Sequence, residues 1–190
     1  MGLRDVILGR RKLKAPAPDR LFAISTAYVT FETELGQTSQ KVAGIVFQPL
    51  DTADFASIAK DMEEVVQASG SDTGTSVENK DDSFGYRWMI LRDDDFDDLV
   101  VGVNAVSDAL QLGGYGDRVL AAVFAFSDSA GKPVYWIYNY KRGAWYPFVP
   151  ARGGQQRNNE RELQIKAQVG ESFPVEPELE RWFPLWGIPI

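Results

Sequence analysis

The stretch KPVYWIYNYKRGAWYPFVP, residues 132–150, decides the fold of this chain. Both of its halves are rich in aromatic residues, which favour β-strands, and residues 141–143 supply a turn that contains glycine. We therefore predict a β-hairpin. Pro147 and Pro150 lack the amide hydrogen that a strand donates to its neighbour, so we expect regular pairing to end near Tyr146.

Large side chains fall on both faces of this predicted hairpin, because successive side chains of a strand point to opposite faces. One face receives Tyr135, Ile137 and Asn139, and the other receives Trp136, Tyr138 and Tyr140. Rings on both faces need cover on both sides. The hairpin is therefore predicted to lie at the centre of a sheet.

The composition indicates a protein with one substantial core. The chain has 190 residues, of which 44% are hydrophobic, and this is most simply one domain. It contains no cysteine and no histidine, which excludes disulfides, thiol nucleophiles, Ser-His-Asp catalysis and His-based zinc sites. An enzyme with this composition would have to use carboxylates, lysine, tyrosine or hydroxyl groups.

Charge is divided unevenly along the chain. Residues 1–14 carry five Lys and Arg against one Asp, a net charge of +4, whereas the remaining residues carry 15 Lys and Arg against 26 Asp and Glu, a net charge of −11. The acidic body argues against a nucleic-acid partner. We therefore divide the chain into a basic segment with a Pro-rich linker, residues 1–19, and a single domain, residues 20–190.

The first half of the domain is predicted to contain two strand pairs and the start of a helical layer. The strands are expected at residues 27–35, 42–47, 76–80 and 86–91. The first two would form a hairpin. Between the pairs, a helix with one apolar face is expected to begin at Asp51 or Asp54 and to end at Gly70, before a polar loop.

The acidic run DDDFDD, residues 93–98, invites two interpretations. Five carboxylates within six residues could bind a cation. However, the run immediately precedes an apolar helical pattern that begins at Leu99, and carboxylates stabilise helix N-termini. The spacing of an EF-hand, with its glycine and distal glutamate, is missing. We therefore prefer helix capping over metal binding.

The second half of the domain is predicted to add a strand at residues 119–126, the hairpin and a helical end. Residues 160–169 fit either a strand or a helix, and we choose a helix that starts at Asn158 or Asn159. A short helix is expected at residues 178–183, and the apolar ending RWFPLWGIPI should dock on the core. Together these elements predict an α+β domain with a mainly antiparallel sheet and helices packed against it.

The chain resembles the PspAB family of PspA-associated proteins along nearly its whole length. The resemblance rests on five main blocks and on Ala43-Gly44: MGLRDVILGRRK at residues 1–12, LFAISTAYVTFETELG at 21–36, GYRW at 85–88, YNYKRGAWYPFVP at 138–150 and ERWFPLWGIPI at 180–190. It implies a cytoplasmic accessory protein linked to PspA, the phage-shock protein that assembles on damaged inner membranes. No enzymatic activity, catalytic residue, cofactor or metal is carried over from the resemblance.

The leading functional hypothesis is therefore a non-enzymatic adaptor that binds a PspA-like protein. The candidate partner contacts are Lys141, Arg142, Trp145 and Tyr146, where cations at a turn stand beside large rings. The candidate contacts with anionic lipid at the inner face of the membrane are Arg4, Arg10, Arg11 and Lys12. For this short segment, the alternative is a frayed, solvated terminus.

Two further hypotheses stay open from the sequence. The aromatic cluster could line a pocket for a small ligand, or for carboxylate-based catalysis, which predicts a deep cavity that contains a carboxylate with a shifted pKa. Alternatively, a chaperone-like module would hold a client segment, which predicts an exposed apolar groove and a dimer interface.

Overall fold

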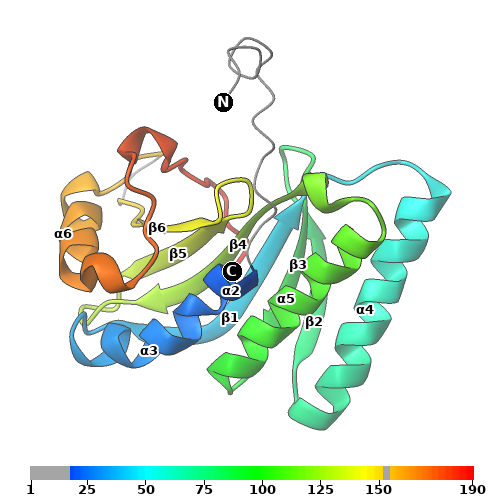
Figure 1. The fold of residues 1–190 in the computed structure, drawn as a ribbon, viewed down its shortest axis with the longest axis horizontal. Helices are drawn as coiled ribbons and strands as arrows, with labels where there is room; N and C mark the ends of the chain where they lie inside the picture. Colours follow the sequence, from blue (N-terminus) through cyan, green and yellow to red (C-terminus); the bar gives the residue numbers. More distant parts are fainter. Residues whose placement is uncertain (1–17, 152–154) are drawn as a thin grey trace, which may run out of the picture.

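A computed structural model describes residues 18–151 and 155–190 and has a six-stranded antiparallel sheet with helices packed on one face (Figure 1). The strand order is β2-β3-β1-β4-β5-β6. The strands are β1 (Thr38–Phe47), β2 (Ser76–Asp81), β3 (Arg87–Arg92), β4 (Val119–Ser127), β5 (Pro133–Asn139) and β6 (Ala144–Phe148). The predicted α+β fold with a mainly antiparallel sheet is confirmed.

The sheet has a hydrophobic core on each of its faces. On one face the apolar side chains of α3 (Ala23–Thr33), α4 (Ala53–Thr73), α5 (Phe96–Leu112) and α6 (Asn159–Val169) cover the strands. On the other face the cover comes from the end of the chain, where Trp182, Leu185, Trp186, Ile188 and Ile190 pack on the strands. Central strands therefore need apolar residues on both sides, which explains their nearly continuous apolar sequences.

The hairpin of residues 132–150 forms as predicted, but its place in the sheet is different. Strands β5 and β6 are the last two strands, so the hairpin is not central, and pairing continues past Tyr146 to the pair Tyr135–Phe148. The amide of Trp145 points outward and donates to Pro174 O (2.9 Å). Pro147, two residues later, faces the same way, so its missing amide hydrogen removes no bond to β5.

Residues 27–35 do not form the predicted strand. They belong largely to helix α3, which follows the short helix α2 (Pro18–Leu21). Ile24 and Phe31 are buried at helical spacing, and the ring of Tyr28 stacks on Phe96 with 4.3 Å between centroids. Burial of this helical stripe outweighs the strand preference of the β-branched residues, so the predicted first hairpin does not exist.

The acidic run caps helix α5, as predicted. The side chain of Asp95 accepts hydrogen bonds from the amides of Asp97 (2.8 Å) and Asp98 (3.4 Å). Asp93 in turn accepts one from the amide of Asp95 (2.8 Å). Among the described residues, no group of three or more acidic side chains is placed to hold a metal ion.

The remaining elements match the predictions in part. Helix α4 runs through Gly70 to Thr73, so the predicted polar loop is shorter than expected. Helix α6 confirms the helical choice for residues 160–169, and the Asn158 side chain caps it by accepting from the amide of Arg161 (3.0 Å). The predicted helix at residues 178–183 is only the 3₁₀ turn Leu179–Arg181.

The cap of α5 yields a prediction about stability. Asp95→Ala removes the acceptor for two amides, so it should lower the free energy of unfolding by about 1 kcal/mol. Asp97→Ala is the matched control, because within residues 18–151 and 155–190 its carboxylate accepts no hydrogen bond and acts through the helix dipole, so its loss should be smaller. Urea unfolding followed by tryptophan fluorescence measures both. Equal losses for the two variants would contradict the capping role.

Candidate functional site

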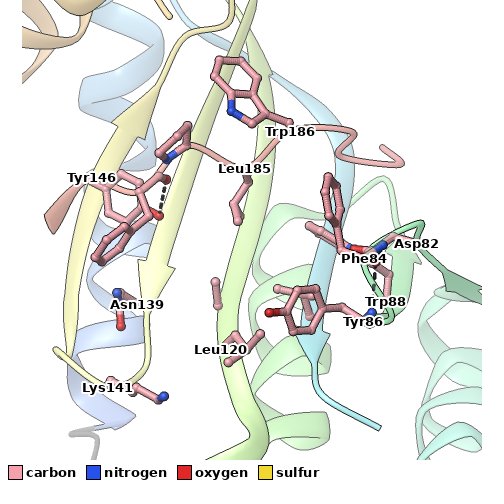
Figure 2. Close-up of a pocket in the computed structure, with 14 residues that line it drawn as sticks. Asp82, Phe84, Tyr86, Trp88, Leu120, Asn139, Lys141, Tyr146, Leu185 and Trp186 are labelled. Atoms are coloured by element: carbon pink, nitrogen blue, oxygen red, sulfur yellow. Dashed lines mark hydrogen bonds between the residues drawn. The ribbon is translucent and has the colours of Figure 1, made fainter. Parts of the chain in front are cut away.

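A groove of about 440 Å³ opens on the face of the sheet opposite the described helices (Figure 2). Its floor is formed by strands β1 and β4. One wall is the β2–β3 turn, and the other is the β5–β6 hairpin together with residues 183–186. The residues that line it are Val46, Asp82, Phe84, Tyr86, Trp88, Leu120, Ala121, Asn139, Lys141, Tyr146, Phe183, Pro184, Leu185 and Trp186.

The turn wall is held in shape by the carboxylate of Asp82. One of its oxygens accepts from the amides of Phe84 (2.8 Å) and Tyr86 (3.0 Å), and the other accepts from Trp88 Nε1 (3.0 Å). Gly85 adopts φ 84°, a left-handed conformation that glycine accepts without strain. As a result the ring of Phe84 is directed outward and stays 61% exposed.

The opposite wall is fixed by hydrogen bonds to the backbone of the C-terminal segment, residues 182–190. Tyr146 Oη donates to Phe183 O (3.0 Å), and Tyr135 Oη donates to Ile190 O (3.2 Å). Trp182 Nε1 donates to Glu176 O (2.9 Å). This segment has no regular secondary structure after residue 181, so side chains from the sheet supply much of its order.

Gly44 of β1 leaves room for the Trp88 ring and for the end of the C-terminal segment. A Cβ atom at this position would lie 3.1 Å from the ring of Trp88 and 3.7 Å from Ile190. Glycine therefore lets the Trp88 ring and the end of the chain lie close to the strand.

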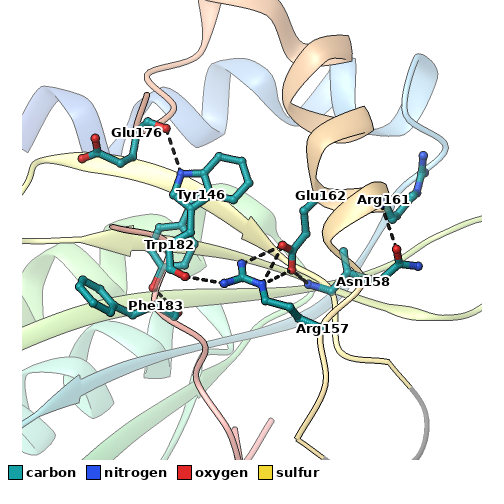
Figure 3. A network of polar contacts seen from close by, with 9 residues as sticks. Tyr146, Arg157, Asn158, Arg161, Glu162, Glu176, Trp182 and Phe183 are labelled. Atoms are coloured by element: carbon teal, nitrogen blue, oxygen red, sulfur yellow. Dashed lines mark hydrogen bonds and ion pairs between the residues drawn. The ribbon is translucent and has the colours of Figure 1, made fainter. Parts of the chain in front are cut away.

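A buried ion pair between Arg157 and Glu162 holds the start of the C-terminal segment (Figure 3). Arg157 Nη2 lies 2.8 Å from Glu162 Oε2, and Glu162, which is only 2% exposed, also accepts from the amide of Val149 (2.8 Å). Arg157 Nη1 donates to Trp182 O at the start of the C-terminal segment. Burial raises the pKa of Glu162, although the hydrogen bond from Arg157 opposes this shift.

The charged residues that line the groove, Asp82 and Lys141, differ in whether they already have a partner. The Asp82 carboxylate is occupied by the three donors of its own turn. Lys141 is exposed, and within residues 18–151 and 155–190 its side chain forms no hydrogen bond or ion pair. Arg142 does not line the groove and pairs with the buried Glu176 (3.0 Å). Lys141 is therefore the cation that the groove offers to a ligand.

The structure separates the four residues that the sequence grouped as partner contacts. Lys141 and Tyr146 line the groove, whereas Arg142 and Trp145 do not. The ring of Trp145 is 0% exposed on the helical side of the sheet, where Nε1 donates to Arg20 O (2.7 Å). Tyr146 is 2% exposed. These rings build the domain and are not available as a surface patch.

The remaining site residues fall into two groups. The predicted lipid contacts Arg4, Arg10, Arg11 and Lys12 lie outside the described residues. Sequence reasoning missed the groove walls Phe84, Tyr86, Phe183, Leu185 and Trp186 as site residues. A signal was present, because blocks 85–88 and 180–190 had already been singled out by the family resemblance.

The chemistry of the groove suits binding. Asp82 is its single carboxylate among the described residues, and no second acid faces it across the groove. The buried carboxylates Glu162 and Glu176 lie outside the lining. The small-ligand and catalytic hypothesis predicted a carboxylate with a shifted pKa inside the cavity, and Glu162, the buried carboxyl whose pKa burial raises, lies outside this groove. An exposed apolar groove is what the client-binding hypothesis predicted.

The chain matches a known protein family over its whole length. The family model described as PspAB, PspA associated protein B, matches residues 1–190. No curated protein and no solved structure matches the chain. None of the described helices combines the length and the apolar character needed to cross a membrane.

The ion pair behind the wall gives a prediction with a defined pH dependence. Arg157→Met leaves a buried carboxylate without its cation, and we expect a loss of about 3–5 kcal/mol in unfolding free energy at pH 8. A carboxyl whose pKa is higher in the folded than in the unfolded protein stabilises the fold as pH falls through the folded pKa. The loss should therefore be smaller at pH 5. Urea unfolding at both pH values measures it.

The double variant Arg157→Met/Glu162→Gln is the control for charge. It removes the titrating group, so its stability relative to the parent should change much less between pH 8 and pH 5. If Arg157→Met lost the same free energy at both pH values, the buried carboxylate would not be the cause.

Proposed function

The chain belongs to the PspAB family, and on this premise we propose that it is a non-enzymatic adaptor that binds a PspA-like protein in the phage-shock response to membrane stress. The family description supports a PspA-associated role. The proposal includes a cytoplasmic location, with peripheral contact at the inner face of the membrane.

The proposal is supported by one observation: three of the sequence blocks that carry the family resemblance meet at one groove. Block 85–88 supplies Tyr86 and Trp88, and block 138–150 supplies Asn139, Lys141 and Tyr146. Block 180–190 supplies Phe183, Pro184, Leu185 and Trp186. Segments that are far apart in sequence thus meet at one open apolar surface, which is the ordinary character of a protein-binding site.

The non-enzymatic part of the proposal rests on the side chains available. The whole sequence lacks histidine and cysteine, and the carboxylate in the groove is fully engaged in holding its turn. A lysine general base needs burial or a nearby cation to lower its pKa, whereas Lys141 is exposed. Lys141 is better suited to contact an anionic group on a partner.

Association with a PspA-like protein is tested by pull-down and by isothermal titration calorimetry with the PspA-like protein encoded in the same genome. We expect binding by the full chain. Lys141→Glu should weaken it by about tenfold, because a reversed charge at a contact repels the partner.

Lys132→Glu is the matched control, because Lys132 is exposed at the opposite end of β5. It should leave the affinity within about twofold of the parent. No association of the full chain would refute the proposed partner, and equal affinity for all variants would refute the contact at the turn.

The N-terminal part of the proposal concerns peripheral contact with the membrane. Arg4, Arg10, Arg11 and Lys12 belong to residues 1–14, whose net charge of +4 would attract anionic lipid headgroups. Co-sedimentation with anionic liposomes, with and without the PspA-like protein, tests this contact. We expect binding that weakens at high salt and is lost in a Δ1–14 truncation.

Neutral liposomes are the control, since they lack the charge that the segment would recognise. Binding that needs the PspA-like protein and ignores the truncation would refute direct lipid contact and assign membrane recruitment to the partner.

A further inference from the structure

Three of the aromatic side chains that line the groove are exposed to solvent. Phe84 is 61% exposed, Phe183 is 58% exposed and Tyr86 is 36% exposed, and they all line the same cavity. Each belongs to a segment that hydrogen bonds hold in place, through Asp82 on one side and Tyr146 on the other. Walls fixed in this way are preorganised, so an apolar ligand would not have to order them.

The floor of the groove restricts the kind of peptide that fits. Val46 and Ala121 pair directly across β1 and β4, whose backbone groups are used in the sheet ladder. A peptide on this face cannot add a strand, because strand addition needs the free edge of a sheet. An apolar peptide bound here must therefore satisfy its own backbone, and a helix does so.

The polar end of the groove defines the charge of the ligand. In Figure 2 the Lys141 side chain lies at one end, and the Trp186 ring lies at the other. The Asp82 oxygens accept bonds from their own turn. Lys141 forms no ion pair with any residue in the described ranges. A carboxylate placed beyond the apolar contacts would thus meet a cation that no described residue neutralises.

We propose that this groove binds an amphipathic helix of a partner protein, with its apolar stripe between Phe84 and Phe183 and an Asp or Glu of the helix at Lys141. The inference deepens the proposed function and rests on it, since it specifies which kind of segment of the PspA-like protein is recognised. The selectivity of the groove itself can be measured without that protein.

The test uses two fluorescein-labelled designed helices that differ at one position. Both carry a leucine stripe, and the residue that follows the stripe on the same face is Glu in one helix and Lys in the other. Fluorescence anisotropy gives their affinities for the full chain. We expect the Glu helix to bind about fivefold tighter than the Lys helix, and Lys141→Glu to reverse this preference.

The apolar contact is tested with a variant that should not disturb the fold. Phe84→Ala removes a largely exposed ring and should weaken both helices by about fivefold or more. Leu112→Ala is the matched control, because Leu112 is 90% exposed at the end of α5, an element of the helical layer. Leu112→Ala and Lys132→Glu should each change the affinities by less than about twofold.

Competition identifies the occupant. Unlabelled PspA-like protein should displace the Glu helix. Displacement by oleate but not by the PspA-like protein would overturn the proposal in favour of an anionic amphiphile. A tighter Glu-helix complex after deletion of residues 1–17 would overturn it in favour of the chain's own N-terminal segment.

The two proposals fail in distinguishable ways. If the PspA-like protein binds but neither displaces the Glu helix nor responds to Phe84→Ala, the groove assignment is overturned and the adaptor function stands. If the Glu helix shows the expected preference while the PspA-like protein does not bind, the selectivity of the groove stands and the proposed partner is refuted. Failure of both helices to bind overturns the groove assignment.

Discussion

The whole structure depends on one constraint, which is that both faces of the antiparallel sheet must be covered. The central strands carry apolar side chains on each side, so neither face can be left to solvent. Helices cover one face, and the end of the chain covers the other. Because the terminal cover is a single irregular segment, it leaves part of its face open. The groove is this uncovered part, bounded by side chains that the cover itself presents.

Polar groups in and around the groove serve mainly to fix its walls. Asp82 folds the β2–β3 turn, Tyr146 holds the backbone at Phe183, and the pair of Arg157 and Glu162 holds the backbone at Trp182. A buried pair of this kind contributes little net stability but becomes costly when one member is removed. Its physical effect is to specify one position for the C-terminal segment. A ligand therefore meets aromatic rings that are already in place, which lowers the entropy lost on binding.

The distribution of charge separates structural acids from the cation left for recognition. Asp95 caps a helix, Glu162 pairs with Arg157, and Glu176 pairs with Arg142. Lys141 is the exposed cation of the groove. This arrangement fits a protein that recognises another molecule by apolar contact and charge. It also explains why the same hairpin turn carries one arginine that serves the fold and one lysine that is directed to the surface.

The sequence by itself determined the features that depend on local chemistry: the hairpin at residues 132–150, the acidic cap of α5 and the docking of the apolar ending. Tertiary structure decided the rest. Residues 160–169 fit a strand or a helix, and burial of Ile165 and Val169 favours the helix. The strand-favouring residues 27–35 became helical because a helix buries Ile24 and Phe31 against the sheet. Pro147 remains in a strand because β6 is an outer strand. Alternate amides of β6 point away from β5, and Pro147 occupies one of these positions, so no bond to β5 is lost. The groove could not be predicted locally, since its walls come from three distant segments that meet only when the sheet has formed.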